Sequence, residues 1–124
     1  MNPRFALIVE DEPDLATIYS EALKAGGFET EIVYDGAVAL QRLKEVNPMV
    51  VVLDLNLPHI AGTDILAQIR ADERLAKTQV VIATADAAMA EMLGESADLV
   101  LLKPVSFMQL RMMAERLAFS VEGN

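Results

Sequence analysis

The residues best suited to chemistry follow four separate apolar runs of the chain, each at the point where its run stops. In chain order these residues are Glu10, Asp11, Asp54, Thr84 and Lys103. Carboxylates, a hydroxyl and an ammonium are groups that can bind a divalent cation and a phosphoryl group. If the four runs are neighbouring strands of one sheet, these side chains meet at one edge.

Clustered acids would need a cation. Two unit charges about 4 Å apart repel by roughly 4 kcal/mol at an effective dielectric near 20. Because the chain has no Cys and a single His, an oxygen-ligand ion, Mg²⁺ or Mn²⁺, is the expected cofactor, held by Glu10, Asp11 and Asp54. A carboxylate beside a metal and an ammonium can also act as a nucleophile and form an aspartyl phosphate. Asp54 is the candidate.

Each of these residues has an ordinary explanation when it is considered alone. Glu10 and Asp11 could complement a helix dipole, Asp54 could cap the following segment, Thr84 could be a turn residue, and Lys103 could be a solvated charge. Their convergence at four strand ends favours a functional site.

The hydrophobic pattern predicts five strands that alternate with five helices. Such alternation indicates an α/β fold with one parallel sheet covered on both faces, and ligands then bind at the carboxyl ends of the strands. The expected strands are 5–9, 28–34, 50–54, 80–83 and 99–102. The fourth helix, Ala87 to Leu93, is expected to be short, and the last helix is expected to end near Phe119.

Composition is typical of one globular domain. The chain has 124 residues, 53% of them hydrophobic, and a net charge of −9. We expect a single domain over 1–124, with a core from about 5 to 119 and a frayed tail or linker at 120–124. The acidic balance argues against direct nucleic-acid binding and against an anionic membrane. Since the apolar run at the N-terminus is too short for a signal or a span, we expect a cytoplasmic protein.

Four motifs in order resemble the receiver domain of two-component response regulators. They are Glu10-Asp11, the segment from Asp54 to Pro58 with Gly62, Thr84-Ala85, and Lys103-Pro104. The resemblance implies a flavodoxin-like, doubly wound (βα)5 fold with strand order 2-1-3-4-5. It also implies that a sensor histidine kinase or a histidine phosphotransfer protein phosphorylates Asp54, and that no separate substrate is turned over.

The same resemblance assigns roles within the site. Asp11 would bind Mg²⁺ directly, Glu10 mostly through water, and Asn56 through its backbone carbonyl. Lys103 would contact the phosphoryl oxygens, and Thr84 would report the phosphorylated state.

Three positions are expected to modulate the switch. The family commonly has an aromatic residue three positions before the Lys, and here Val100 occupies that place. The segment between Thr84 and Lys103 is also short. In the family, the residues two positions beyond the phosphoacceptor and the Thr influence dephosphorylation. The resemblance therefore implies that Asn56 and Asp86, which occupy these places and are polar, promote loss of the phosphoryl group by positioning water.

The last helix is predicted to be apolar on two faces. At 100° per residue, one face should pack on the sheet and consists of Phe107, Leu110, Ala114 and Leu117. Met108, Met112 and Phe119 fall on nearly the opposite face, which predicts a contact surface for a dimer mate, a kinase or an output domain.

Two other functions stay open. A phosphatase resembling the haloacid dehalogenase group would also use a strand-end Asp, but it needs an Asp where this chain has Asn56, and it carries its nucleophile on the first strand. A receiver-like module that is never phosphorylated is the second alternative. His59 has no partner at metal-ligand spacing and is interpreted as a loop residue.

Overall fold

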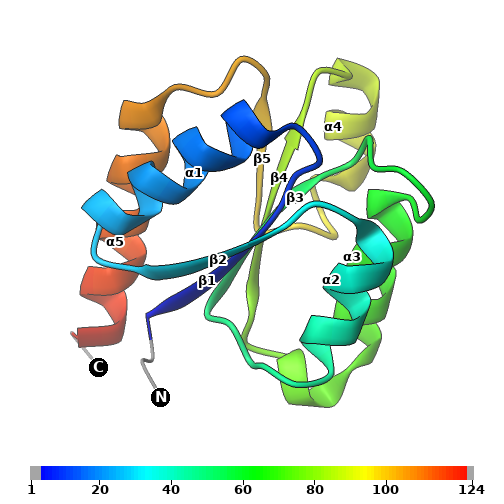
Figure 1. Cartoon of the computed structure of the whole chain (residues 1–124), viewed down its shortest axis with the longest axis horizontal. Helices are drawn as coiled ribbons and strands as arrows, with labels where there is room; N and C mark the ends of the chain where they lie inside the picture. The colour runs from blue at the N-terminus through cyan, green and yellow to red at the C-terminus, as the bar shows by residue number, and fades with distance from the viewer. Residues whose placement is uncertain (1–3, 123–124) are drawn as a thin grey trace.

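The computed structural model describes residues 4–122, with side chains as far as Ala118. It contains one five-stranded parallel sheet in the order β2-β1-β3-β4-β5, which confirms the predicted doubly wound fold. The strands are β1 (Phe5–Val9), β2 (Glu29–Val33), β3 (Val50–Asp54), β4 (Gln79–Thr84) and β5 (Leu99–Leu102). Figure 1 shows the helices on both sides of this sheet.

The helices form two layers. They are α1 (Pro13–Ala25), α2 (Gly36–Leu43), α3 (Gly62–Ala71), α4 (Ala87–Leu93) and α5 (Phe107–Glu122), with a short 3-10 helix, η1 (Glu73–Leu75). In Figure 1, α1 and α5 lie together on one side, and α2, α3 and α4 lie on the other. Each side has its own apolar core against the sheet, one containing Tyr19 and Leu110, the other Ile65 and Ile69.

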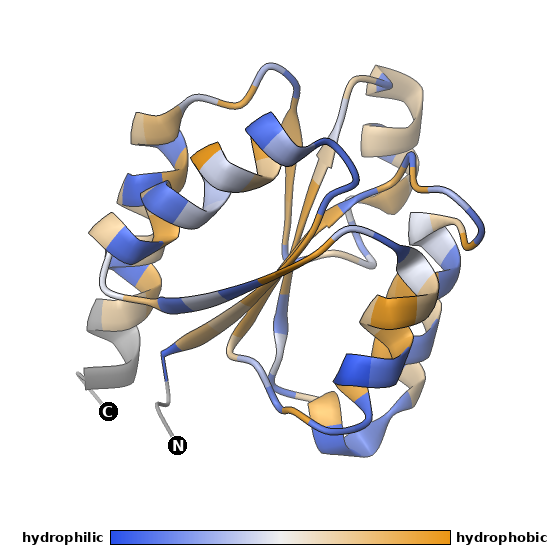
Figure 2. Ribbon diagram, in the orientation of Figure 1, coloured by the Kyte–Doolittle hydropathy of each residue, from blue (hydrophilic) through white to orange (hydrophobic). Residues whose placement is uncertain are grey.

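Burial explains the strand composition. Every residue of β3 is buried, as expected for a central strand covered by helices on both faces. The edge strand β2 starts with the sequence Glu-Thr-Glu and is only partly buried, and hydrophilic colours mark this part of the sheet in Figure 2. Among the described residues, no helix is both long enough and apolar enough to cross a bilayer.

The register aligns the ends of the strands. Val9 pairs with Leu53, Asp54 with Ala83, and Thr84 with Leu102. Residues that follow β1, β3, β4 and β5 therefore start from the same edge of the sheet.

The last helix is longer than predicted, since α5 continues past Phe119 to Glu122, and one expectation for its packing is wrong. Phe107 does not pack on the sheet, since it is 40% exposed as the first residue of α5. Leu110 and Ala114 are buried and Leu117 packs against the core, as predicted.

Gly62 allows α3 to start against the site strand. Its amide donates to the carbonyl of Leu55 at 3.3 Å. A Cβ on Gly62 would lie 2.6 Å from the Asp54 carbonyl oxygen and 2.6 Å from the Leu55 Cα. Both are backbone atoms, so a side chain here must displace the end of β3 or the start of α3.

We predict that Gly62→Ala lowers the free energy of unfolding by about 1–3 kcal/mol through this clash, as measured by urea denaturation. Gly94→Ala is the matched control, because its Cβ would meet backbone oxygens only at 3.6 and 3.8 Å, and it should change stability by less than about 0.5 kcal/mol. Equal stability of the two variants would contradict the close approach.

Candidate functional site

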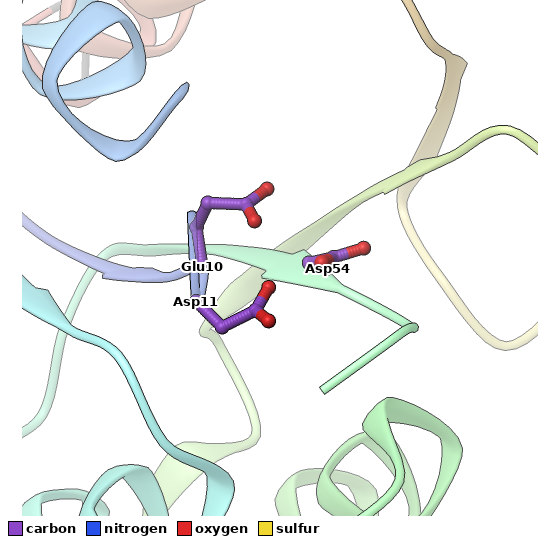
Figure 3. Close-up of side chains that lie close together, drawn as sticks. All are labelled: Glu10, Asp11 and Asp54. Carbon is purple, nitrogen blue, oxygen red and sulfur yellow. The ribbon is translucent and has the colours of Figure 1, made fainter. Parts of the chain in front are cut away.

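Three carboxylates meet at the carboxyl edge of the sheet. Glu10 and Asp11 follow β1, and Asp54 ends the neighbouring strand β3. Each offers an oxygen atom, and these atoms all lie within 4.8 Å of one another. Figure 3 shows the three side chains directed toward a common space. Glu10 is only 1% exposed and Asp54 3%, whereas Asp11 is exposed.

Lys103, which follows the edge strand β5, forms ion pairs with both buried acids at the carboxyl edge of the sheet. Its Nζ lies 3.3 Å from an oxygen of Glu10 and 3.3 Å from Oδ1 of Asp54. Burial by itself would lower the pKa of Lys103, but the charges of Asp54 and Glu10 outweigh it and raise the pKa above its ordinary value. The ammonium therefore stays charged, and it balances part of the negative charge of the cluster.

Glu10 is the acid most affected by burial. Desolvation raises its pKa from 4.5 to about 7, although a hydrogen bond from the Glu12 amide at 3.2 Å opposes the rise. The nearby Asp54 adds to the increase, and Lys103 lowers it. Near neutral pH this carboxyl thus binds a proton readily, and a cation beside it would favour the charged form instead.

Asp54 opens onto a groove. Its Oδ1 accepts a hydrogen bond from the Asn56 amide at 3.2 Å. The groove has a volume of about 330 Å³, and its lining includes Asp54, Asn56, Thr84, Ala85, Asp86 and Met89. The predicted phosphoacceptor, the predicted hydroxyl and two of the three predicted modulators, Asn56 and Asp86, are thus brought together around one space.

The hydroxyl of Thr84 is connected to α4. Its Oγ1 accepts from the Asp86 amide at 3.1 Å. The Asp86 carboxylate caps α4, because Oδ1 accepts from the amides of Ala88 and Met89 at 3.0 and 3.1 Å. Asp86 therefore has a structural role that its position two residues beyond Thr84 did not reveal, and its effect on water stays a prediction.

Val100 and α4 show how the switch region is packed. Val100 is partly buried against the core on the side of α2, α3 and α4. The short helix α4 contains no fully buried residue. The limits predicted for α4 are confirmed, and few of its side chains are held by the core.

Part of the predicted apolar surface of α5 is present. Met108 is 51% exposed and Met112 53%, while the side chain of Phe119 lies outside the described residues. A groove of about 450 Å³ runs between α5 and the edge strand β5, and its lining includes Leu99, Gln109 and Met112.

Tyr19 carries a buried polar group that the sequence pattern did not single out. The periodicity of α1 counts it as an apolar position, and its ring is indeed 1% exposed in the core under α1 and α5. Its hydroxyl is buried without a hydrogen-bond partner. Burial raises the pKa of this hydroxyl, Lys103 opposes the rise, and Glu10 and Asp54 add to it.

The donor set fits a hard divalent cation. It consists of carboxylate oxygens, one of them exposed and two buried, which suits Mg²⁺ or Mn²⁺ and offers no soft ligand. Asp11, Glu10 and Asp54 would hold the ion.

Comparison with known proteins identifies the class. The family model of the response regulator receiver domain matches residues 6–115, so the chain belongs to the response regulator receiver domain family. This result agrees with the position of Asp54 on β3 rather than on the first strand, and it argues against the phosphatase alternative.

The relatives are longer regulators. The transcriptional regulatory protein TrcR of Mycobacterium tuberculosis is 33% identical over 88% of this chain and 43% of its own length. The sensory transduction protein RegX3 of Mycobacterium bovis is 36% identical over 84% of this chain and 46% of its own. The chain thus spans less than half of these relatives. Among solved structures, the receiver domain of a Luxo repressor protein from Vibrio parahaemolyticus has a TM-score of 0.83 and 26% identity, covering 99% of this chain and 98% of that one.

The pKa of Glu10 predicts a pH dependence. Between pH 4.5 and about 7 the folded carboxyl keeps a proton that the unfolded chain loses, so its contribution to stability is complete below 4.5 and is lost as the pH rises through 7. In metal-free buffer, Glu10→Gln should therefore gain stability relative to the wild type over this range, on the order of 3 kcal/mol.

Urea denaturation at each pH measures this difference. Glu12→Gln is the control, because Glu12 is exposed, and it should follow the wild-type profile. Parallel profiles for Glu10→Gln and the wild type would show that Glu10 titrates normally.

Proposed function

We propose that this chain is a phosphorylation-dependent switch, in which Asp54 accepts a phosphoryl group from a sensor histidine kinase or a histidine phosphotransfer protein in the cytoplasm. The observation that carries the proposal is the convergence of Lys103 on Asp54 and Glu10, at 3.3 Å each, beside a third acid. This arrangement supplies a nucleophile, a fixed cation and oxygen ligands for Mg²⁺ at one edge.

In the proposed reaction, an Asp54 carboxylate oxygen attacks the phosphorus of the donor. A new P–O bond forms as the bond from phosphorus to the donor breaks, and the leaving group keeps that electron pair. Lys103 moves with its charge onto the phosphoryl oxygens, and the Thr84 hydroxyl donates to one of them. A bound Mg²⁺ would supply further charge neutralisation of the transferring group.

Hydrolysis would return the site to its starting state. Water attacks the phosphorus, and Asp54 leaves as a carboxylate. Asn56 is exposed on the rim of the groove, where it can position this water, and we retain Asp86 as the second modulator. The chain is thus its own substrate and needs no separate one.

Incubation with acetyl phosphate and Mg²⁺ should add one phosphoryl group to the wild-type chain, as measured by intact-protein mass spectrometry. Asp54→Asn should abolish the adduct because the nucleophilic oxygen is lost. Asp64→Asn, which changes an exposed acid in the first turn of α3, is the matched control and should be modified normally. If several phosphodonors all fail to modify the wild type, the chain is a scaffold that is never phosphorylated.

We further propose that the face of α5 and β5 binds a second copy of this chain. β5 is an edge strand, and exposed Leu99, Met108 and Met112 lie on this face. Charges of both signs accompany them, including the Arg111–Glu115 pair at 2.8 Å, and such a mixture suits a two-fold contact in which each charge can meet its opposite. Direct DNA contact is not expected from this chain, because its net charge is −9.

The double substitution Met108→Glu and Met112→Glu should prevent dimer formation by the beryllofluoride-treated chain, as measured by sedimentation velocity, because it buries charge in an apolar contact. Met92→Glu is the control, since Met92 is exposed on α4. A chain that stays monomeric in the wild type, or dimers that survive the double substitution, would exclude this face as a dimer contact and leave a kinase or an output domain as its partner.

A further inference from the structure

His59 lies in the loop between β3 and α3 with a backbone conformation that few residues other than glycine adopt. Its φ is 69°, in the left-handed region that glycine enters without steric cost. The side chain is 74% exposed, so apolar packing does not explain a histidine at this position. The polar contact of its ring is the feature that distinguishes it from a glycine.

The ring of His59 contacts the residue that caps α2. Its Nδ1 lies 2.7 Å from Oδ2 of Asp35, while Oδ1 of the same carboxylate accepts from the amides of Ala37 and Val38. The hydrogen bond to His59 lowers the pKa of Asp35, so the carboxylate is charged near neutral pH and the ring nitrogen donates to it. One carboxylate therefore holds both the first turn of α2 and the β3–α3 loop.

A second contact lies beside the first. A Cβ on Gly36 would lie 2.9 Å from the Cβ and 2.9 Å from the carbonyl oxygen of Ile60, so the start of α2 lies directly against the residue after His59. The chain before α2 is itself attached to the site, because the Glu10 amide donates to the carbonyl of Val33, the last residue of β2, at 3.1 Å. The loop is thus held against a segment that is bonded to the acidic cluster.

The same loop brings Asn56 to the site. The Asn56 amide donates to Oδ1 of Asp54 at 3.2 Å, and the bond from the Gly62 amide to the Leu55 carbonyl closes the base of the loop at 3.3 Å. Between these two anchors, the ring of His59 holds the middle of the loop. Because Asn56 lies three residues before His59, a shift at His59 would move the Asn56 backbone relative to the carboxylates.

We propose that His59 is a positioning residue of the metal site, whose bond to Asp35 fixes the β3–α3 loop and with it the backbone of Asn56 beside Asp54. The inference deepens the proposed function, since Mg²⁺ binding at this edge is part of that function. His59 is not one of the clustered carboxylates that could hold the ion, and it acts through the loop.

Order of the loop in the metal-free chain provides the first test. His59→Ala should speed amide exchange in residues 55–61 several-fold, as measured by hydrogen–deuterium exchange with mass spectrometry, because the link to Asp35 is lost. Asp35→Ser should do the same, since Ser still caps α2 but lacks the second oxygen that the ring contacts. Asp72→Ser is the matched control, because Asp72 likewise caps a helix, η1, and it should leave exchange in this loop unchanged.

Mg²⁺ affinity separates the role of the ring from backbone strain. His59→Ala and His59→Gly should both bind Mg²⁺ roughly threefold more weakly than the wild type in isothermal titration calorimetry, because both lack the ring. His59→Gly should be the more stable of the two in urea denaturation, since only Gly adopts the left-handed backbone without steric cost. Wild-type affinity in His59→Gly would show that strain rather than the ring governs the loop, and would overturn the inference.

The double variant tests whether the two side chains act through one bond. The losses of affinity in His59→Ala and Asp35→Ser should not add when the substitutions are combined, because each removes the same contact, and additive losses would contradict the inference. A wild-type chain that binds no Mg²⁺ would contradict the proposed function instead. Amide exchange in the metal-free chain would still decide whether His59 positions the loop.

Discussion

The ion pairs of one ammonium with two buried carboxylates hold the site together. Lys103 follows the edge strand β5, whereas Glu10 and Asp54 come from the central strands β1 and β3, so these contacts extend over four neighbouring strands. They form only because parallel strands end in register at the same edge. The sheet order is therefore a requirement of the site as well as a property of the fold.

The negative charge at this edge of the sheet is only partly balanced by positive charge. Three carboxylates face one ammonium, and the pKa of Glu10 is raised to about 7 chiefly because burial disfavours its charged form. A proton or a divalent cation would relieve this imbalance, and the phosphoryl group proposed for Asp54 would draw Lys103 away from Glu10. The same shortage of positive charge would favour a bound cation and would make the site responsive to the phosphorylation proposed for Asp54.

The fold and most of the site could be predicted from sequence because both depend on short-range patterns. Apolar runs that stop at polar residues identify strand ends, and the parallel alternation then brings Asp54, Thr84 and Lys103 together. Side-chain partners depend on tertiary packing and were not predictable in this way. Asp86 caps α4, Phe107 faces outward because it starts its helix, and Tyr19 looks like an apolar residue until the burial of its hydroxyl is known.

The connection from the site to the surface follows from the same contacts. The Thr84 oxygen accepts from the Asp86 amide, and the Asp86 carboxylate holds the first turn of α4. If the Thr84 side chain moved toward a phosphoryl group, the backbone amide of Asp86 would lose Thr84 Oγ1 as its hydrogen-bond acceptor. Since α4 contains no fully buried residue, little packing opposes its displacement, and a short Val100 leaves no aromatic ring to be moved. If Asp54 is phosphorylated as proposed, these contacts would connect that state to α4 through a helix cap rather than through an aromatic side chain.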